Sequence, residues 1–150
     1  MRIGIIGFGK MGMLHAGIVS AVTNTELIAV AEPNSFLNSF LKKLMPSLSI
    51  HTDYKKLLDA ENPDAVFITT PVDLHVPIAL ECNDRNIPFF CEKPLTNTLE
   101  LAQTLSDEVE KSGVINMVGH MMRYQDTFQK CKKIIDTGCL GNLITFNASI

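Results

Sequence analysis

The sequence lacks the features that direct a chain to a metal, a membrane or a nucleic acid. Its four cysteines show no CxxC spacing, and no set of His, Cys and acidic residues has the spacing of a zinc site. No apolar run approaches the length that a bilayer requires, and no basic patch stands out at a net charge of −3. We therefore expect no metal, no membrane and no nucleic acid as partners, and a cytoplasmic protein with reduced, partly buried thiols.

The chain opens with a short apolar segment, residues 2–6, that runs straight into Gly7-x-Gly9-x-x-Gly12. Gly7 lets the chain turn sharply off a strand, Gly9 has no Cβ to block a pyrophosphate, and Gly12 lets a helix pack closely on the sheet. A helix that starts here offers free N–H groups and the positive end of its dipole to phosphates. The motif alone is weak evidence, so its context decides.

That context has the order of a dinucleotide-binding unit. Helical spacing follows over residues 11–22, at Met11, Leu14, Ile18 and Val22. A second strand is expected over 26–31, and Glu32 ends it, 20 residues after Gly12, where a carboxylate accepts hydrogen bonds from an adenosine ribose. The alternative is an ordinary turn between strand and helix with a surface glutamate at position 32.

Glu32 also bears on the choice of cofactor. A carboxylate at this position repels the 2′-phosphate of NADP and bonds the free hydroxyls of NAD. No arginine follows it closely, since the next residues are Pro33, Asn34 and Ser35. We therefore expect NAD rather than NADP.

Strands and helices alternate through residue 119. Further helices are expected over 35–45, 54–60, 74–85 and 98–113, and further strands over 48–51, 64–70, 87–91 and 114–119. Asp53 and Thr98 are expected to cap the helices that follow them. Such alternation predicts an α/β fold, a doubly wound parallel Rossmann sheet with strand order 3-2-1-4-5-6. Ligands of such sheets lie at the carboxyl ends of the strands.

Polar residues gather after three of these strands, in the stretches 69–75, 91–94 and 119–124. At the second stretch, the chain resembles the Gfo/Idh/MocA family, of the glucose–fructose oxidoreductase and inositol dehydrogenase type. The motifs are GFGKMG at 7–12, His15-Ala16, Glu32, TTPVDLH at 69–75, CEKPL at 91–95 and GHMMRY at 119–124. Members of this family are usually two-domain, nicotinamide-dependent dehydrogenases that act on sugars, cyclitols or related polyols.

The resemblance implies a set of site residues. The pyrophosphate falls at Gly7, Phe8, Gly9, Lys10, Met11 and Gly12, and the ribose at Glu32. The rest of the dinucleotide falls along Thr69, Thr70, Pro71 and His75, with Glu92 and Lys93 beside the nicotinamide and Arg123 near it. Residues 120–122 depart from the family's commoner pattern of a small residue, Asn and Arg.

Lys93 is the expected catalytic residue. Its ammonium stabilises a developing alkoxide on the substrate, and the neighbouring carboxylate of Glu92 can orient that ammonium. The alternative for this pair is an exposed ion pair of little consequence. The alternative for the protein is a non-catalytic NAD-binding sensor or regulatory module, which needs no charge at this position. We expect His15 to be a helix-packing residue that bonds the backbone or a neighbouring loop.

The end of the chain carries a different pattern. A helix is expected over 125–138, and residues 142–150 alternate apolar and polar as a half-buried strand does. By resemblance, residues 1–122 form the NAD-binding domain, and 123–150 begin a truncated α+β substrate domain whose remainder is absent. This chain is then expected to bind NAD, to turn substrate over poorly, and to form homo-oligomers through the absent part. A naturally short protein that pairs this strand across a dimer is the alternative.

Overall fold

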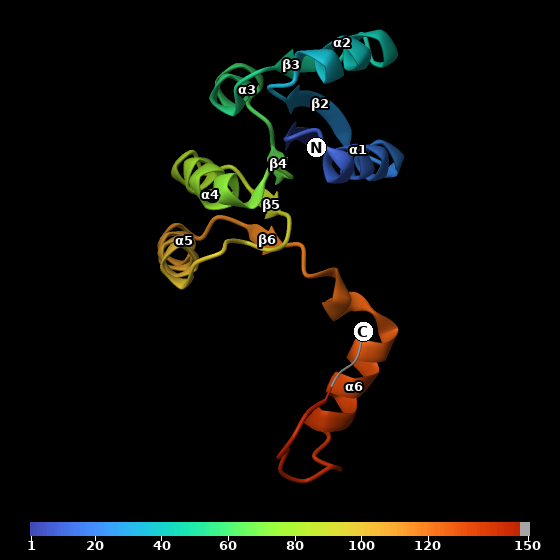
Figure 1. Ribbon diagram of the computed structural model, residues 1–150, viewed down its shortest axis with the longest axis vertical. Coiled ribbons are helices and arrows are strands. Elements are labelled where there is room, and N and C mark those ends of the chain that lie inside the picture. Colours follow the sequence, from blue (N-terminus) through green and yellow to red (C-terminus); the bar gives the residue numbers. More distant parts are fainter. Residues whose placement is uncertain (148–150) are drawn as a thin grey trace. The chain divides into compact units, whose positions relative to one another are not determined.

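The structure is a computed structural model that describes residues 1–147, and these form two compact units, one over Met1–Gly119 and one that begins at His120. The first unit is built on a six-stranded parallel sheet with the order β3-β2-β1-β4-β5-β6 (Figure 1). The strands are β1 (Arg2–Ile6), β2 (Glu26–Ala31), β3 (Ser49–His51), β4 (Ala65–Ile68), β5 (Phe89–Cys91) and β6 (Asn116–Val118). The predicted Rossmann order is therefore confirmed, although several strands are shorter than the apolar runs that predicted them.

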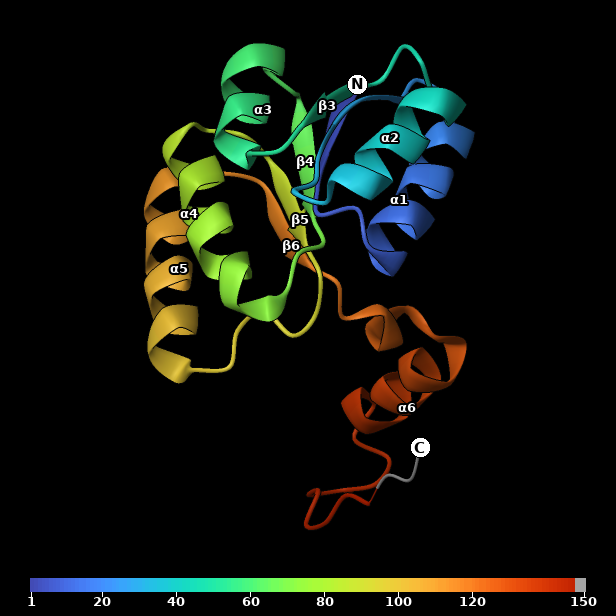
Figure 2. The ribbon, with the colours of Figure 1, turned by 45° about the horizontal axis from the view of Figure 1, so that its top comes forward.

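Helices cover both faces of the sheet, as Figures 1 and 2 show. One face carries α1 (Lys10–Ala21) and α2 (Ser35–Leu44), and the other carries α3 (Tyr54–Glu61), α4 (His75–Asp84) and α5 (Leu99–Ser112). Neighbouring strand residues enter opposite cores, since Ile5 packs with Leu41 of α2 while Ile6 packs with Leu57 of α3. Burial on both faces explains why the central strands are continuous apolar runs.

Side-chain caps start three of the helices. Asn34 Oδ1 accepts hydrogen bonds from Phe36 N and Leu37 N at the start of α2. Asp53 Oδ1 accepts one from Lys55 N at 2.8 Å, and Thr98 Oγ1 accepts one from Leu101 N at 3.4 Å. The expected caps at Asp53 and Thr98 are thus confirmed.

The buried face of α1 differs from the one that its apolar residues predict. Met11, Leu14, Ile18 and Val22 are between 38% and 54% exposed, while Gly12, Ala16 and Val19 are buried. At the start of α1 the buried position is a glycine because a Cβ on Gly12 would overlap the carbonyl oxygen of Gly7 in the turn after β1. Ile18 and Val22 instead line an apolar groove with residues of β4, β5 and β6.

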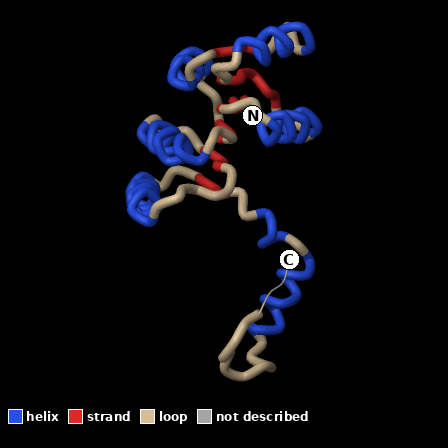
Figure 3. Tube along the Cα trace, viewed as in Figure 1, coloured by secondary structure: helices blue, strands red, loops and turns tan. Residues whose placement is uncertain are grey.

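The second unit contains a 3₁₀ turn, Met121–Tyr124, and the helix α6, Asp126–Asp136 (Figure 3). The strand expected over 142–150 is wrong for residues 142–147, which form no strand, and residues 148–150 lie outside the described part. An isolated strand has no neighbour to receive its backbone hydrogen bonds, so alternation alone does not form one. The predicted division into domains 1–122 and 123–150 stays a prediction. None of the helices in the described part of the chain combines the length and the hydrophobicity that a membrane span requires.

Candidate functional site

The turn after β1 depends on two close backbone approaches. Gly7 has φ of +89°, and a Cβ there would lie 2.9 Å from the Thr69 carbonyl and from Thr70 N. A Cβ on Gly12 would overlap the carbonyl oxygen of Gly7. Thr69 Oγ1, at the end of β4, donates a hydrogen bond to that same Gly7 oxygen at 2.5 Å. Only glycine therefore lets β1, β4 and α1 meet at this corner of the sheet.

The N-terminus of α1 is open. Its N-cap residue is Gly9, which has no side chain to accept a hydrogen bond from the first turn, and the first turn carries no acidic residue. The helices α2, α3 and α5 each have a side-chain cap at the same place. The first-turn N–H groups of α1 are thus available to an outside acceptor, and the helix dipole favours an anionic one.

Glu32 fastens the turn from the end of β2. Its Oε2 accepts a hydrogen bond from Phe8 N at 2.8 Å, and its Oε1 accepts one from Asn34 N at 2.9 Å. Only 9% of the residue is exposed. A carboxylate has about four lone-pair sites, so two of them remain for hydroxyl donors.

A groove of about 840 Å³ opens along this edge of the sheet. Eight of the predicted residues line it, namely Gly7, Gly9, Lys10, Met11, Glu32, Thr69, Thr70 and Pro71. The hydroxyl Oγ1 of Thr70 is buried and has no hydrogen-bond partner among the described residues. The groove also takes in Thr52, Asp53 and Tyr54 after β3, which sequence reasoning missed because their only visible pattern was a helix cap.

Phe8, Gly12 and His75 shape the edge without lining this groove. The Phe8 side chain is buried beside α1 and α2, and its N–H is directed to Glu32. The His75 ring is buried, with Nδ1 2.9 Å from the Pro94 oxygen and Nε2 2.8 Å from the Thr70 oxygen. His75 therefore joins the loop after β4 to the loop after β5. A neutral ring donates a hydrogen bond to one of the two carbonyl oxygens at a time, and a protonated ring donates to both.

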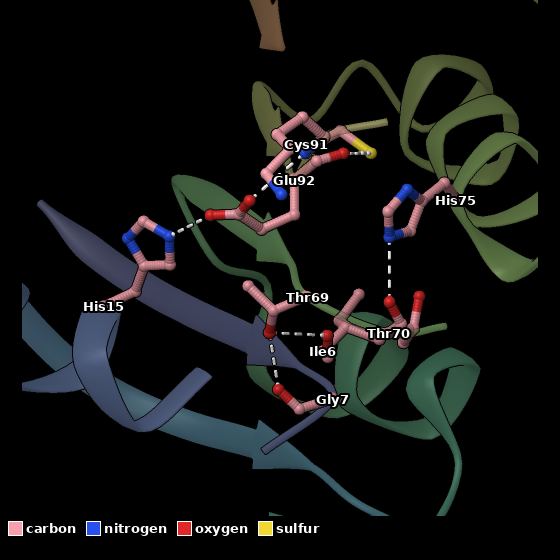
Figure 4. Close-up of polar contacts among 9 residues, drawn as sticks. Ile6, Gly7, His15, Thr69, Thr70, His75, Cys91 and Glu92 are labelled. Atoms are coloured by element: carbon pink, nitrogen blue, oxygen red, sulfur yellow. Dashed lines mark hydrogen bonds and ion pairs between the residues drawn. The ribbon is translucent and has the colours of Figure 1, made fainter. Parts of the chain in front are cut away.

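The loop after β5 is held by a second histidine (Figure 4). Glu92 is 8% exposed, and its Oε1 lies 2.7 Å from Nε2 of His15 on α1. Its Oε2 accepts a 3.2 Å hydrogen bond from Lys93 N. Lys93 itself is exposed and makes no ion pair with the residues that the structure describes. The carboxylate that we expected to orient the Lys93 ammonium is thus occupied by His15.

The ring of His15 is fixed by aromatic neighbours. Its centroid lies 5.0 Å from that of Phe67 on β4 and 5.1 Å from that of Phe90 on β5. The sequence predicts a contact with the backbone or a neighbouring loop, and the structure shows that the partner is the Glu92 carboxylate, directly after β5. The available signal was a histidine one turn into the helix after the glycine motif, together with a glutamate at the end of a neighbouring strand.

The remaining predicted groups lie elsewhere. Arg123 belongs to the 3₁₀ turn of the second unit, so its place near a cofactor stays a prediction. All four cysteines are free, and burial raises the pKa of the Cys82 and Cys91 thiols to about 12. Residues 1–147 contain no group of three or more His, Cys, Asp or Glu side chains that could hold a metal ion.

Comparison with known proteins gives this geometry a context. Residues 1–120 match the profile of the Gfo/Idh/MocA family, described as an oxidoreductase family with an NAD-binding Rossmann fold. The chain is similar to a scyllo-inositol 2-dehydrogenase (NAD(+)) of Bacillus subtilis, with 31% identity over 150 residues that cover 97% of the chain and 43% of that protein.

Two further proteins to which the chain is similar are also inositol dehydrogenases. A myo-inositol 2-dehydrogenase of Thermotoga maritima is 28% identical over 94% of the chain and 42% of its own length. The crystal structure of a myo-inositol 2-dehydrogenase from Lactobacillus plantarum superposes with a TM-score of 0.83 and 30% identity, covering 96% of the chain and 43% of that structure. The chain therefore spans about two fifths of the length of these relatives.

Proposed function

This chain belongs to the Gfo/Idh/MocA family of oxidoreductases with an NAD-binding Rossmann fold. From that premise we propose that it is the cofactor-binding part of an NAD-dependent dehydrogenase. The observation that carries the proposal is the uncapped N-terminus of α1, which opens on a groove that also contains the Glu32 carboxylate. A dinucleotide needs both an acceptor for its ribose hydroxyls and donors for its pyrophosphate, and these residues supply both.

Each part of the groove has a role in this proposal. The first-turn N–H groups of α1 bind the pyrophosphate, and the absence of a Cβ on Gly9 leaves room for it. Glu32 accepts hydrogen bonds from the adenosine ribose and repels a 2′-phosphate, which favours NAD over NADP. The unpartnered hydroxyl of Thr70 can donate to a polar group farther along the groove. The name of the Bacillus subtilis relative, which specifies NAD(+), supports the same choice.

For the whole protein, we propose a hydride transfer between NAD and a hydroxyl or carbonyl carbon of a polyol, sugar or cyclitol. When bound, NAD supplies the hydride chemistry. The exposed ammonium of Lys93 stabilises negative charge on the substrate oxygen and can exchange a proton with it. The names of the inositol dehydrogenases to which the chain is similar make inositols the first substrates to test.

Binding is tested with the 150-residue chain. Isothermal titration calorimetry should detect NAD, with NADP at least about tenfold weaker because of the charge on Glu32. The variant Gly9→Ala should weaken NAD binding, because its methyl group enters the open space at the helix start. Gly17→Ala is the matched control, since a Cβ at either glycine meets no protein atom within 4 Å. Equal affinity of both variants for NAD, or a preference for NADP, would contradict the assignment.

Turnover is tested in the full-length protein by the formation of NADH from inositols and sugars. Lys93→Ala should lower kcat by about 100-fold or more and leave the NAD affinity close to that of the parent. A protein that binds NAD but oxidises no polyol, with or without Lys93, would instead be the non-catalytic sensor.

Two further expectations belong to this proposal. A cytoplasmic location is supported by the four free thiols, because disulfides are rare in reducing compartments. Assembly into homo-oligomers through residues outside this chain rests on the family resemblance alone, and sedimentation of the full-length protein tests it.

A further inference from the structure

Two cationic or hydrogen-bond-donating side chains, Lys93 and His15, could pair with the Glu92 carboxylate. It is almost fully buried, yet the next residue in the chain is a lysine whose ammonium is needed at the substrate. A buried carboxylate requires hydrogen-bond donors or a cation, and the nearest cation in sequence is Lys93. An ion pair between the two would withdraw the ammonium from the substrate and neutralise its charge. The structure shows a different partner for Glu92, the imidazole of His15.

We propose that His15 is a positioning residue that occupies the Glu92 carboxylate and thereby keeps the Lys93 ammonium free for the substrate. This inference rests on the proposed dehydrogenase function and extends it to a residue on the first helix. His15 Nε2 must carry the proton of the 2.7 Å contact, because an ionised carboxylate only accepts hydrogen bonds. The other carboxylate oxygen accepts a hydrogen bond from the backbone N–H of Lys93, so each oxygen of Glu92 has one hydrogen-bond partner that is not the ammonium.

The surroundings of His15 are built to hold this contact. Phe67 and Phe90 lie against its ring at centroid distances of 5.0 and 5.1 Å, and they come from the two strands that end at the site. The side chains of His15 and Glu92 are 13% and 11% exposed, so water competes weakly for the contact. Because His15 is on the helix that starts at the glycine turn, the pair also ties the phosphate end of the site to the loop that carries Lys93.

The chain contains a matched control. His51 and Glu61 form a second pair of the same kind, with Nε2 2.9 Å from Oε1 and side-chain exposures of 19% and 18%. This pair joins β3 to α3 and contacts neither Lys93 nor Glu92. His15→Phe and His51→Phe therefore remove comparable contacts, while only the first releases the Glu92 carboxylate.

The first measurement is catalytic and uses the full-length protein with NAD and the best polyol substrate. His15→Phe keeps an aromatic ring against Phe67 and Phe90 but has no donor, so kcat should fall about tenfold to 100-fold while KM for NAD changes little. His15→Gln, whose amide can donate to Glu92, should recover part of kcat. His51→Phe should lower the melting temperature to a similar extent without changing kcat. An equal effect of the two Phe variants on kcat would overturn the proposal.

The second measurement does not depend on activity. Competitive acetylation by acetic anhydride, read by mass spectrometry, compares the labelling of Lys93 with that of the exposed Lys43. In His15→Phe the released carboxylate pairs with the ammonium, so labelling of Lys93 should slow about threefold or more. The double variant His15→Phe/Glu92→Gln removes the negative charge and should restore the labelling.

The activity measurement and the acetylation of Lys93 together distinguish a failure of the proposed dehydrogenase function from a failure of the proposed role of His15. A parent protein that forms no NADH from any polyol would contradict the proposed function, while slowed labelling in His15→Phe would still support the role of His15. Unchanged labelling of Lys93 in His15→Phe, or slow labelling that Glu92→Gln does not relieve, would contradict that role even in an active dehydrogenase.

Discussion

The two loops at the carboxyl edge of the sheet are built by different means. The turn after β1 is shaped by backbone approaches that only Gly7 and Gly12 allow. The loop after β5 is held by side chains from distant elements, His15 of α1 and His75 of α4. The first loop needs two glycines of its own and is further held by Glu32 and Thr69, whereas the side-chain contacts named for the second loop come from histidines of two helices. Changes in the two loops should have the larger effects on stability and reactivity, and a change at the His51–Glu61 pair, which lies outside both loops, should have the smallest.

Gly12→Val should have the largest effect on the first loop. Its side chain would overlap the Gly7 carbonyl, so the free energy of unfolding should fall by about 3 kcal/mol and NAD binding should be lost. Urea denaturation and calorimetry measure the two quantities. Gly17→Ala, on the same helix, should instead be neutral or stabilising by up to about 1 kcal/mol, because nothing contacts its Cβ. A stable Gly12→Val protein that binds NAD would show that the approach at this corner is not required.

The rate of thiol labelling at Cys91 tests how often the loop after β5 opens to solvent. Cys91 ends β5 directly before Glu92, and burial raises its pKa to about 12, as it does for Cys82. At pH 8, Cys91 and Cys82 should react with a thiol reagent more than about 100-fold more slowly than the exposed Cys131 and Cys139. Mass spectrometry of the native chain should therefore find two modified thiols, and four after denaturation. Rapid labelling of Cys91 would mean that the loop opens frequently.

His75→Phe removes the contact that joins the loops after β4 and β5. The part-buried carbonyl oxygens of Thr70 and Pro94 would lose the ring that donates to one of them when neutral and to both when protonated, so the free energy of unfolding should fall by about 2 kcal/mol. Urea denaturation measures the loss. The variant His75→Gln, whose amide can still donate, serves as the control and should lose less. A loss equal for both variants would attribute the effect to packing rather than to hydrogen bonds.

The His51–Glu61 pair should give the smallest effect and one that depends on pH. The hydrogen bond from His51 lowers the pKa of the Glu61 carboxyl from its usual 4.5. A lowered pKa in the folded state contributes stability above the unfolded pKa, and that stability is lost as the pH falls through the folded value. The parent should thus be more stable than His51→Phe by about 1 kcal/mol or less at pH 6.

The advantage of the parent should shrink as the pH falls below 4.5, where the unfolded chain takes up a proton, and it is lost once the pH passes the lowered pKa of Glu61 in the folded parent. Urea denaturation of the parent and of His51→Phe at pH 6 and at a pH below 4.5 checks the trend. In the background of Glu61→Gln, which has no carboxyl at this position, the effect of His51→Phe on stability should not change between the two pH values. An advantage that grows on acidification would reverse the assigned sign.

Much of the fold was readable because its signals are local. Strand order followed from alternating segments and the position of the glycine motif, and the caps at Asp53 and Thr98 are properties of the residues next to them. The buried face of α1 was not readable, because Gly12, Ala16 and Val19 face the sheet while Met11, Leu14 and Ile18, the larger apolar residues, stay about half exposed. The strand expected after residue 142 failed over 142–147 for a related reason, since alternation specifies a face but not a neighbouring strand.

The candidate site likewise combines features set by a few consecutive residues with contacts between residues far apart in the chain. The sequence by itself determined the glycine turn, the carboxylate at Glu32 and the placement of Lys93 at a strand end, because a turn, an acceptor and a strand terminus are each defined by a few consecutive residues. Only the tertiary structure decided that the side chain of Glu92 pairs with the His15 ring rather than with the Lys93 ammonium, and that His75 is buried between two loops instead of lining the groove. These contacts join residues far apart in the chain, and a hydrogen bond forms only where packing brings its donor and acceptor within about 3 Å.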